Sequence, residues 1–106
     1  TATGKSVNAY VPYSDKAVAA ASGTRILFFH ASWCPQCRAL EADIQQQGIP
    51  EGITIFKVDY DNAQDLRKKY GVTLQTTVVK VDETGKLISK FTPYQKPTLK
   101  NALDNL

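Results

Sequence analysis

Hydrophobic residues fall into short runs that polar, glycine-containing segments separate. Residues 25–31 form a nearly continuous apolar run, which is typical of a strand covered on both faces of a partly parallel sheet. β-branched and aromatic residues also predict strands at 53–59 and 77–81. A loop that contains Gly85 joins the second of these to a further strand at 86–91, as in a hairpin. The pattern therefore predicts four strands, with 25–31 at the centre.

Helical patterns alternate with these strands. Helices are predicted at 15–21, 35–47, 62–69 and 97–106. Asn62 is well placed to cap the third of them. The order of helices and strands predicts an α/β fold in which a mixed central sheet has helices on both faces.

The length of the chain predicts one folded domain. The 106 residues, 42% of them hydrophobic, suffice for a single core. We assign residues 1–13 to a polar N-terminal segment and residues 14–106 to the domain. No run of about 18 apolar residues is present, and residues 1–10 lack the apolar stretch of a signal peptide. Because the sequence starts at Thr1, we expect a mature or trimmed form whose export segment or membrane tether lies outside these residues.

The distribution of charge argues against a nucleic-acid partner. The net charge of +3 comes from 13 basic and 10 acidic residues scattered along the chain. Arg67-Lys68-Lys69 is the only basic triplet, and it lies where a helix is predicted to end, a place where the helix dipole favours positive charge. We therefore expect no nucleic-acid binding.

Two cysteines mark the boundary between the central strand and the helix at 35–47, in the segment Cys34-Pro35-Gln36-Cys37. A thiol attacks only as the thiolate, and the free N–H groups and the dipole of a helix N-terminus stabilise an anion. Cys34 would occupy the cap position. Cys37 would lie one turn along the same helix face, within reach of a mixed disulfide formed at Cys34. The spacing predicts an attacking thiol and a resolving thiol.

Two other interpretations of the cysteine pair were weighed against redox chemistry. A zinc site usually needs four soft or imidazole ligands, and the chain adds only His30 to the two thiols. A structural disulfide at this spacing would close a loop too small to restrict the unfolded chain much. A redox role therefore outweighs both.

Three segments follow one another along the chain. They are Trp33-Cys34-Pro35-Gln36-Cys37 after the apolar strand, Val58-Asp59 at the end of the next strand, and Tyr70-Gly71-Val72 before the hairpin. In this order they resemble the thioredoxin-like family across residues 15–106. The resemblance implies a thioredoxin-like fold and disulfide exchange with protein thiols and disulfides, without a bound cofactor or metal. It implies Cys34 as the nucleophile, Cys37 as the resolving thiol and Trp33 as an aromatic wall beside the site, although a tryptophan next to a turn also simply packs over it.

The chain departs from the family pattern before the hairpin. Thr76 stands where the family has a cis-proline that faces the cysteines. A cis bond before a non-proline residue costs about 2.5–4 kcal/mol, so we expect the 75–76 bond to be trans and the substrate-holding loop to be shaped differently. Relatives that bind metal or reduce peroxide often lack this proline, which keeps both alternatives open.

A second departure concerns the buried acid near the cysteines. Phe28 takes the place of a buried Asp of typical thioredoxins, and Ile55 takes the place of the Lys that pairs with it, so we expect both partners to be apolar. The internal proton acceptor for Cys37 would then be lost. His30 is the only imidazole available to replace it or to tune the thiolate. A structural histidine at the strand end explains His30 equally well.

The dipeptide between the cysteines is Pro35-Gln36, where typical thioredoxins have Gly-Pro. Pro35 has no N–H, so the Cys34 thiolate would depend on the N–H groups of Gln36 and Cys37. Whether the pair works as a reductant or as an oxidant stays open.

We therefore predict a monomeric thiol-disulfide oxidoreductase that uses Cys34 and Cys37 to exchange disulfides with protein substrates and with an upstream redox partner. The predicted location is outside the bacterial cytoplasm, in the periplasm or at the cell surface, with the cytoplasm as the alternative. Two other functions stay open. One is a metal-handling protein that binds copper or zinc through Cys34, Cys37 and His30, and the other is a non-catalytic binding module on a redox fold.

Overall fold

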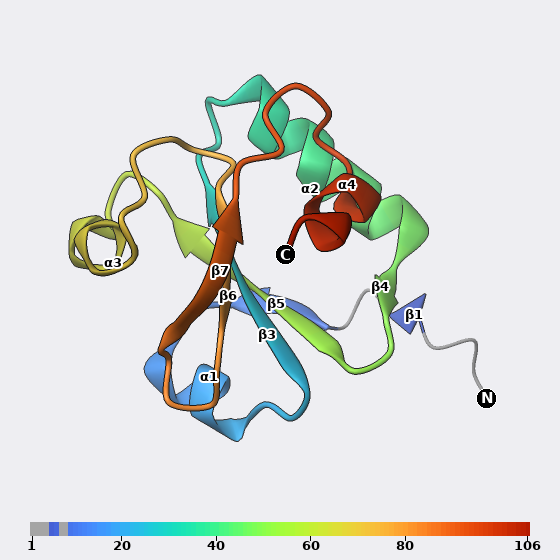
Figure 1. The fold of residues 1–106 in the computed structure, drawn as a ribbon. Coiled ribbons are helices and arrows are strands. Elements are labelled where there is room, and N and C mark those ends of the chain that lie inside the picture. The colour runs from blue at the N-terminus through green and yellow to red at the C-terminus, as the bar shows by residue number, and fades with distance from the viewer. Residues whose placement is uncertain (1–4, 7–8) are drawn as a thin grey trace.

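A mixed sheet of five strands forms the centre of the protein (Figure 1). The computed structural model describes residues 5–6 and 9–106. The strands lie in the order β2 (Tyr10–Pro12), β5 (Ile53–Asp59), β3 (Thr24–His30), β6 (Val78–Val81) and β7 (Leu87–Phe91). β2, β5 and β3 are parallel, whereas β6 and β7 run antiparallel to their neighbours. Outside this sheet, β1 (Lys5–Ser6) pairs antiparallel with β4 (Ile49–Pro50).

β3 is the central strand, because it pairs with β5 on one side and with β6 on the other. Every residue of β3 from Arg25 to His30 is buried. Successive side chains of a strand point to opposite faces of the sheet, so burial of all of them requires that both faces be covered. The prediction that the apolar run 25–31 forms a central, doubly covered strand is confirmed.

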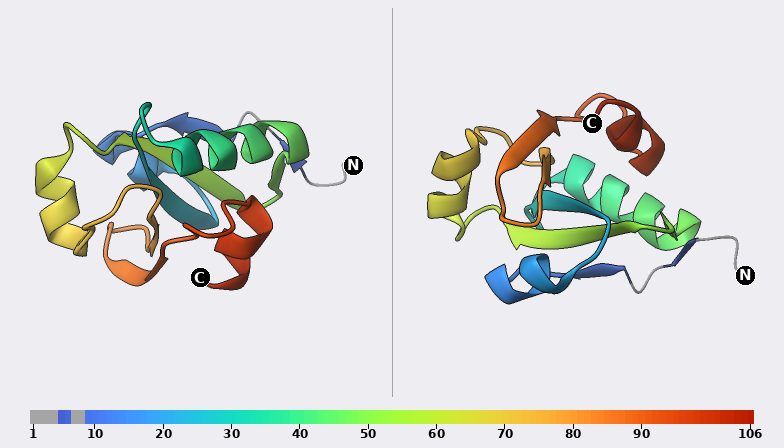
Figure 2. Two further views of the ribbon diagram at one scale, coloured as in Figure 1. Left: turned by 90° about the horizontal axis from the view of Figure 1, so that it is seen from above. Right: turned by 60° about the horizontal axis from the view of Figure 1, so that its bottom comes forward.

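The described residues contain four α-helices, which are α1 (Asp15–Ala20), α2 (Pro35–Gln47), α3 (Gln64–Tyr70) and α4 (Leu99–Asp104). α2 and α4 are in contact with each other, and the right-hand view of Figure 2 shows them on one side of the sheet with α1 on the opposite side. The α/β fold with helices on both faces is therefore confirmed. None of these helices combines the length and the apolar character that crossing a membrane would require.

The ends of α3 and α4 differ from the prediction. Asn62 does not cap α3, because its side chain donates to the Asp59 carboxylate at 2.6 Å. The helix instead begins after Ala63, which makes no side-chain capping hydrogen bond. α4 is shorter than the predicted 97–106, since Thr98 caps its N-terminus. A side chain that could cap a helix can also bond to other nearby groups, and the sequence alone does not show which bond it makes.

The edge strand β2 corrects the expected domain boundary. The sequence assigns residues 1–13 to a segment outside the domain, yet β2 lies within that segment and belongs to the sheet. β2 pairs in parallel with β5, so that Tyr10 lies beside Ile55. Residues 1–4 and 7–8 of the segment lie outside the described residues. A strand of three residues that ends in a proline is too short for a hydrophobic pattern to reveal.

Candidate active site

Cys34 lies between the carboxyl end of β3 and the start of α2. Its side chain caps the helix, because the N–H of Cys37 donates to Cys34 Sγ at 3.2 Å. The N–H of Cys34 donates to the Ala31 carbonyl at 3.0 Å, which holds the turn between strand and helix. Pro35 follows in the first turn, where a missing N–H removes no intrahelical bond. The predicted cap position is confirmed, and both thiols are free and buried.

Thr76 contacts both sulfur atoms. Its hydroxyl oxygen lies 3.3 Å from Cys34 Sγ and 3.1 Å from Cys37 Sγ, and the side chain is fully buried. The described residues contain no cis peptide bond, so the predicted trans bond at 75–76 is confirmed. The backbone is nevertheless unusual, because Thr76 has a φ of 74°, which is rare for a β-branched residue. The sequence placed Thr76 near the cysteines, but it did not predict that the hydroxyl joins them.

The surroundings shift the pKa values of the two thiols in opposite directions. Burial alone would raise the pKa of the Cys34 thiol, but hydrogen bonds from the Thr76 hydroxyl, from Cys37 and from the Gln36 backbone outweigh burial and lower that pKa. Burial raises the pKa of the Cys37 thiol to about 11, and the nearby Cys34 sulfur adds to the rise. Cys34 is therefore the thiol that ionises first, and Cys37 keeps its proton at neutral pH.

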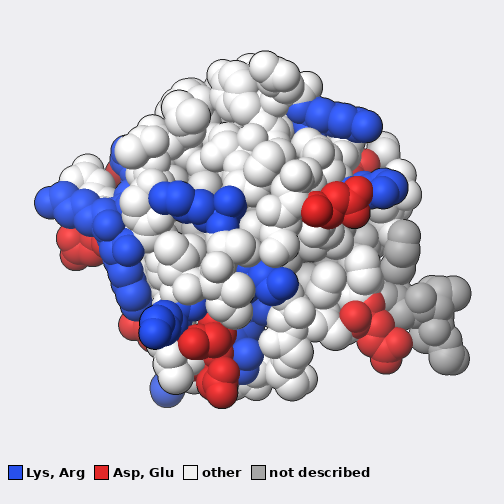
Figure 3. All heavy atoms as spheres, in the orientation of Figure 1, with Lys and Arg blue, Asp and Glu red and all other residues white. Residues whose placement is uncertain are grey.

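Trp33 lies at the rim of the site. The side chain is 55% exposed, and its indole N–H donates to the Asp61 carboxylate at 2.8 Å, so it is fixed beside the motif without entering the core. Leu74, in the loop before Thr76, and Tyr94, in the loop after β7, are also exposed. Figure 3 shows few charged side chains at the end of the molecule where α2 begins. On the face that Figure 3 shows, this end of the molecule carries little charge, and Asp61 and Arg38 are charged residues beside the motif.

His30 does not join the two cysteines. The side chain is buried at the end of β3, where its ring meets the Phe28 ring edge-on. Nε2 has no hydrogen-bond partner among the described residues and lies 3.4 Å from Glu41 Oε1. Burial lowers the pKa of His30, and the attraction of Glu41 offsets this only in part, so the imidazole is neutral at pH 7. His30 thus faces a carboxylate rather than a sulfur.

Glu41 is the centre of a partly buried group of polar side chains that the sequence did not reveal. Its carboxylate accepts a hydrogen bond from the Tyr10 hydroxyl at 2.6 Å and pairs with Lys57 Nζ at 2.9 Å. We name Glu41, Lys57 and Tyr10 the carboxylate cluster. Glu41 follows Cys37 by four residues, so both lie on the same face of α2. That spacing was the signal in the sequence that could have identified Glu41.

Phe28 and Ile55, the positions expected to replace the buried Asp–Lys pair, are both buried in the core, which agrees with the expectation that both are apolar. Phe28 lies opposite Lys57, whereas Ile55 lies opposite Ile26. A basic residue nevertheless lies beside Phe28, because Lys57 on β5 pairs with the Glu41 carboxylate on α2. The two apolar positions are thus accompanied by a partly exposed ion pair that the sequence did not predict.

The described residues show no arrangement suited to a metal ion. No three side chains of His, Cys, Asp or Glu in the described part of the chain lie close enough together to hold one ion. The two thiols lie together, but the third proposed ligand, His30, faces Glu41. No contact therefore favours the metal-handling alternative.

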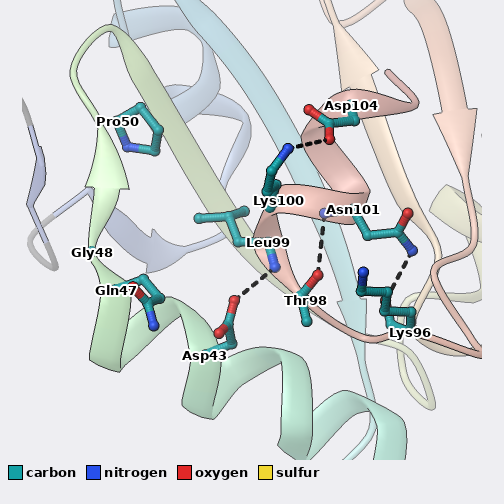
Figure 4. A pocket seen from close by; sticks show the side chains of 10 residues that line it. All are labelled: Asp43, Gln47, Gly48, Pro50, Lys96, Thr98, Leu99, Lys100, Asn101 and Asp104. Carbon is teal, nitrogen blue, oxygen red and sulfur yellow. Dashed lines mark hydrogen bonds and ion pairs between the residues drawn. The ribbon is translucent and has the colours of Figure 1, made fainter.

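A hollow of about 540 Å³ lies between α2 and α4, away from the cysteines (Figure 4). Polar groups along it bond one another. Asp43 accepts from the N–H of Leu99 at 2.8 Å, and Lys100 pairs with Asp104 at 2.8 Å. Since Asp43 thereby holds the start of α4 against α2, these contacts are those of a packed junction between two helices.

Comparisons with known proteins agree with this fold and site. The family model for Thioredoxin matches residues 9–105. Thioredoxin H4 of Arabidopsis thaliana is 32% identical over 77 residues, which are 70% of this chain and 63% of that protein. Thioredoxin-1 of Caenorhabditis elegans is 38% identical over 55 residues, which are 51% of this chain and 48% of that protein. The chain spans between 46% and 64% of the length of the curated relatives it matches.

Solved structures show the same fold. The structure of Trxlp from Edwardsiella tarda superposes with a TM-score of 0.68 at 23% identity, covering 83% of this chain and 90% of that one. Thioredoxin of Malassezia sympodialis superposes with a TM-score of 0.63 at 21% identity, covering 78% of this chain and 79% of that one. At these identities the likeness concerns the fold alone. Because the family model covers nearly the whole described chain, the chain belongs to the thioredoxin family.

Proposed function

We propose that the protein is a thiol-disulfide oxidoreductase that acts on protein disulfides through Cys34 and Cys37. The observation that carries this proposal is the asymmetry of the buried pair. Cys34 caps a helix and its pKa is lowered, whereas burial raises the pKa of Cys37 to about 11. One thiol is thus prepared to attack, and the other is held in reserve. Membership of the thioredoxin family supports the same chemistry.

The exchange takes place in two steps. The Cys34 thiolate attacks a substrate disulfide, so that a bond forms between Cys34 and one substrate sulfur while the substrate bond breaks and its other sulfur leaves as a thiolate. Cys37 then loses its proton and attacks Cys34 Sγ, which closes the internal disulfide and releases the second substrate sulfur. Two electrons pass from the two cysteines to the substrate. The reverse sequence oxidises a dithiol substrate, and neither direction needs a bound cofactor.

The surface around the cysteines suits a protein substrate. Trp33, Leu74 and Tyr94 are exposed, and the face that Figure 3 shows carries little charge at this end of the molecule, so an apolar rim is available there. A polypeptide segment that carries the disulfide can lie against such a rim while its sulfur reaches Cys34. We therefore propose protein disulfides, rather than small charged thiols, as the substrate class.

Replacement of each cysteine in turn tests the proposal. Cys34→Ser is expected to abolish turnover of a model protein disulfide, because it removes the attacking sulfur. Cys37→Ser is expected to accumulate a mixed disulfide between Cys34 and the substrate, which mass spectrometry detects and added reductant releases. Full turnover in either variant, or alkylation of Cys34 with the pH profile of an unactivated thiol, would contradict the proposal.

Four points stay predictions, namely the location outside the cytoplasm, the bacterial source, the monomeric state and the upstream redox partner. Cell fractionation tests the location, and sedimentation of the purified chain tests the monomeric state. The direction of the reaction depends on the reduction potential of the Cys34/Cys37 couple, which equilibration against a thiol buffer of known potential measures.

A further inference from the structure

The Thr76 hydroxyl is the one polar side-chain group that contacts both reacting sulfurs in the described residues. Its distances of 3.3 Å to Cys34 Sγ and 3.1 Å to Cys37 Sγ are short for hydrogen bonds that involve sulfur, and either atom of each pair can be the donor. A hydroxyl has one hydrogen to donate and lone pairs with which to accept. Thr76 can therefore donate to one sulfur while it accepts from the other.

Backbone hydrogen bonds tie the loop that carries this hydroxyl to β3. The N–H of Thr76 donates to the Phe29 carbonyl at 2.9 Å, and the N–H of Phe29 donates to the Thr77 carbonyl at 3.0 Å. These bonds fix the loop to β3 and maintain the φ of 74° at Thr76. A β-branched residue kept in this conformation carries a cost that the surrounding bonds must offset.

We propose that the Thr76 hydroxyl is a catalytic group that serves the two thiols in turn, donating its hydrogen first to Cys34 Sγ and then to Cys37 Sγ. This inference rests on the proposed disulfide exchange and adds a residue to it. In the reduced protein the hydroxyl donates to the Cys34 thiolate while it accepts from the Cys37 thiol. The same hydroxyl thus stabilises the nucleophile and holds the resolving thiol beside it.

The hydroxyl changes partner between the two steps. After Cys34 has bonded to the substrate sulfur, it carries no negative charge and is a poor acceptor. The released substrate thiolate takes up a proton from solvent, and Cys37 gives up its proton to solvent. Rotation of the Thr76 hydroxyl then directs its hydrogen to the new Cys37 thiolate, which attacks Cys34 Sγ and displaces the second substrate sulfur. Each thiol is helped to ionise only while it is the nucleophile, so a larger fraction of it is thiolate at neutral pH in the step in which it attacks.

A set of threonine variants tests the inference. Thr76→Val keeps the size and branching of the side chain but removes the hydroxyl, and Thr76→Ala is a second variant without it. Thr76→Ser keeps the hydroxyl. Thr77→Val is the matched control, because it removes a neighbouring buried hydroxyl that bonds Leu74 and Thr92 and does not contact sulfur. Alkylation rates and thiolate absorbance against pH give the Cys34 pKa of each folded variant without any substrate.

Loss of a hydrogen bond to a thiolate is expected to raise the Cys34 pKa by about one to two units in Thr76→Val and Thr76→Ala. Thr76→Ser and Thr77→Val should keep the wild-type value. The mixed disulfide should persist about tenfold longer in Thr76→Val, because the Cys37 thiolate loses the same donor. The couple should also become more reducing, since the reduced form is the one that the hydroxyl stabilises.

An unchanged Cys34 pKa in both variants that lack the hydroxyl would overturn the inference. An equal rise in Thr76→Ser and Thr76→Val would also overturn it, because packing and not the hydroxyl would then set the pKa. These outcomes are separate from failure of the proposed function, which would show as full turnover without Cys34. If the wild-type Cys34 pKa is lowered and no Thr76 variant changes it, the proposed function stands and only the role of Thr76 is overturned.

Discussion

Two polar regions flank the cysteine pair, one of them buried and the other partly exposed, and they differ in kind. On the loop side, a neutral hydroxyl from Thr76 contacts both sulfurs. On the strand side, the carboxylate cluster of Glu41, Lys57 and Tyr10 bonds internally, and no hydrogen bond in the described residues links it to a sulfur. A neutral donor can stabilise a thiolate without adding a repelling charge, whereas a carboxylate at the same distance would raise the thiol pKa. We therefore expect the reactivity of Cys34 to depend on Thr76 and the stability of the fold to depend on the carboxylate cluster.

The largest effect is expected from removal of the charge in the carboxylate cluster. Glu41→Leu leaves the Tyr10 hydroxyl and the Lys57 ammonium without their acceptor, so it should lower the free energy of unfolding by about 2 kcal/mol. Urea unfolding measures this loss. The Cys34 pKa should stay at the wild-type value, because no contact joins Glu41 to that sulfur.

Glu41→Gln is the matched control for this variant. Its amide oxygen can still accept from Tyr10, so the loss of stability should be smaller than in Glu41→Leu. A rise of the Cys34 pKa in Glu41→Leu as large as in Thr76→Val would contradict the division between the two regions. The cluster and the sulfurs would then form one electrostatic unit.

A smaller effect is expected from pH, and it should again come from the strand side. Burial would raise the pKa of Glu41, but hydrogen bonds from Tyr10 and Lys57 and the nearby His30 lower it overall. Burial lowers the pKa of His30, whose charged neighbours are Glu41, Lys57, Asp59 and Arg38. In both cases the unfolded chain binds a proton more readily than the folded protein does, so stability rises with pH.

Stability should therefore fall in two stages as pH decreases. The first begins near the unfolded pKa of His, about 6.5, and the second near that of Glu, about 4.3, each continuing down to the lower folded value. His30→Gln should remove the upper stage, and Glu41→Gln the lower one. Urea midpoints measured across this range check the expectation, which would be incorrect if the protein became more stable on acidification.

The cysteine site could be predicted from sequence because local interactions determine it. Cys34, Pro35 and Cys37 lie within four consecutive positions, and a cap followed by a proline fixes their geometry without help from distant residues. The central strand was equally clear, since a run of buried apolar residues needs no knowledge of its neighbours.

The resemblance placed Thr76 near the cysteines, but neither the direction of its hydroxyl nor the carboxylate cluster could be predicted, because both depend on long-range register. Thr76 reaches the cysteines from about 40 positions along the chain, and only the loop on β3 determines where its hydroxyl points. Lys57 and Ile55 differ by two positions on β5, so both point to the same face of the sheet and the hydrophobic pattern does not tell which of them lies opposite Phe28. The structure shows that it is Lys57. Tyr10 was missed with the short strand that carries it.

The smallest effect is expected from an exposed ion pair with nearly the same geometry as the one in the carboxylate cluster. Lys100 and Asp104 are 2.8 Å apart on the surface of α4, and Lys57 and Glu41 are 2.9 Å apart beside the core. Water screens the exposed pair, and two mobile side chains lose entropy when they pair. Asp104→Asn should therefore leave the urea midpoint within experimental error of wild type, whereas Glu41→Gln lowers it. If Asp104→Asn and Glu41→Gln lowered the urea midpoint equally, the distance within the ion pair would explain the contribution of the carboxylate cluster to stability. The partial burial of Glu41 and its second donor, Tyr10, would then contribute nothing further.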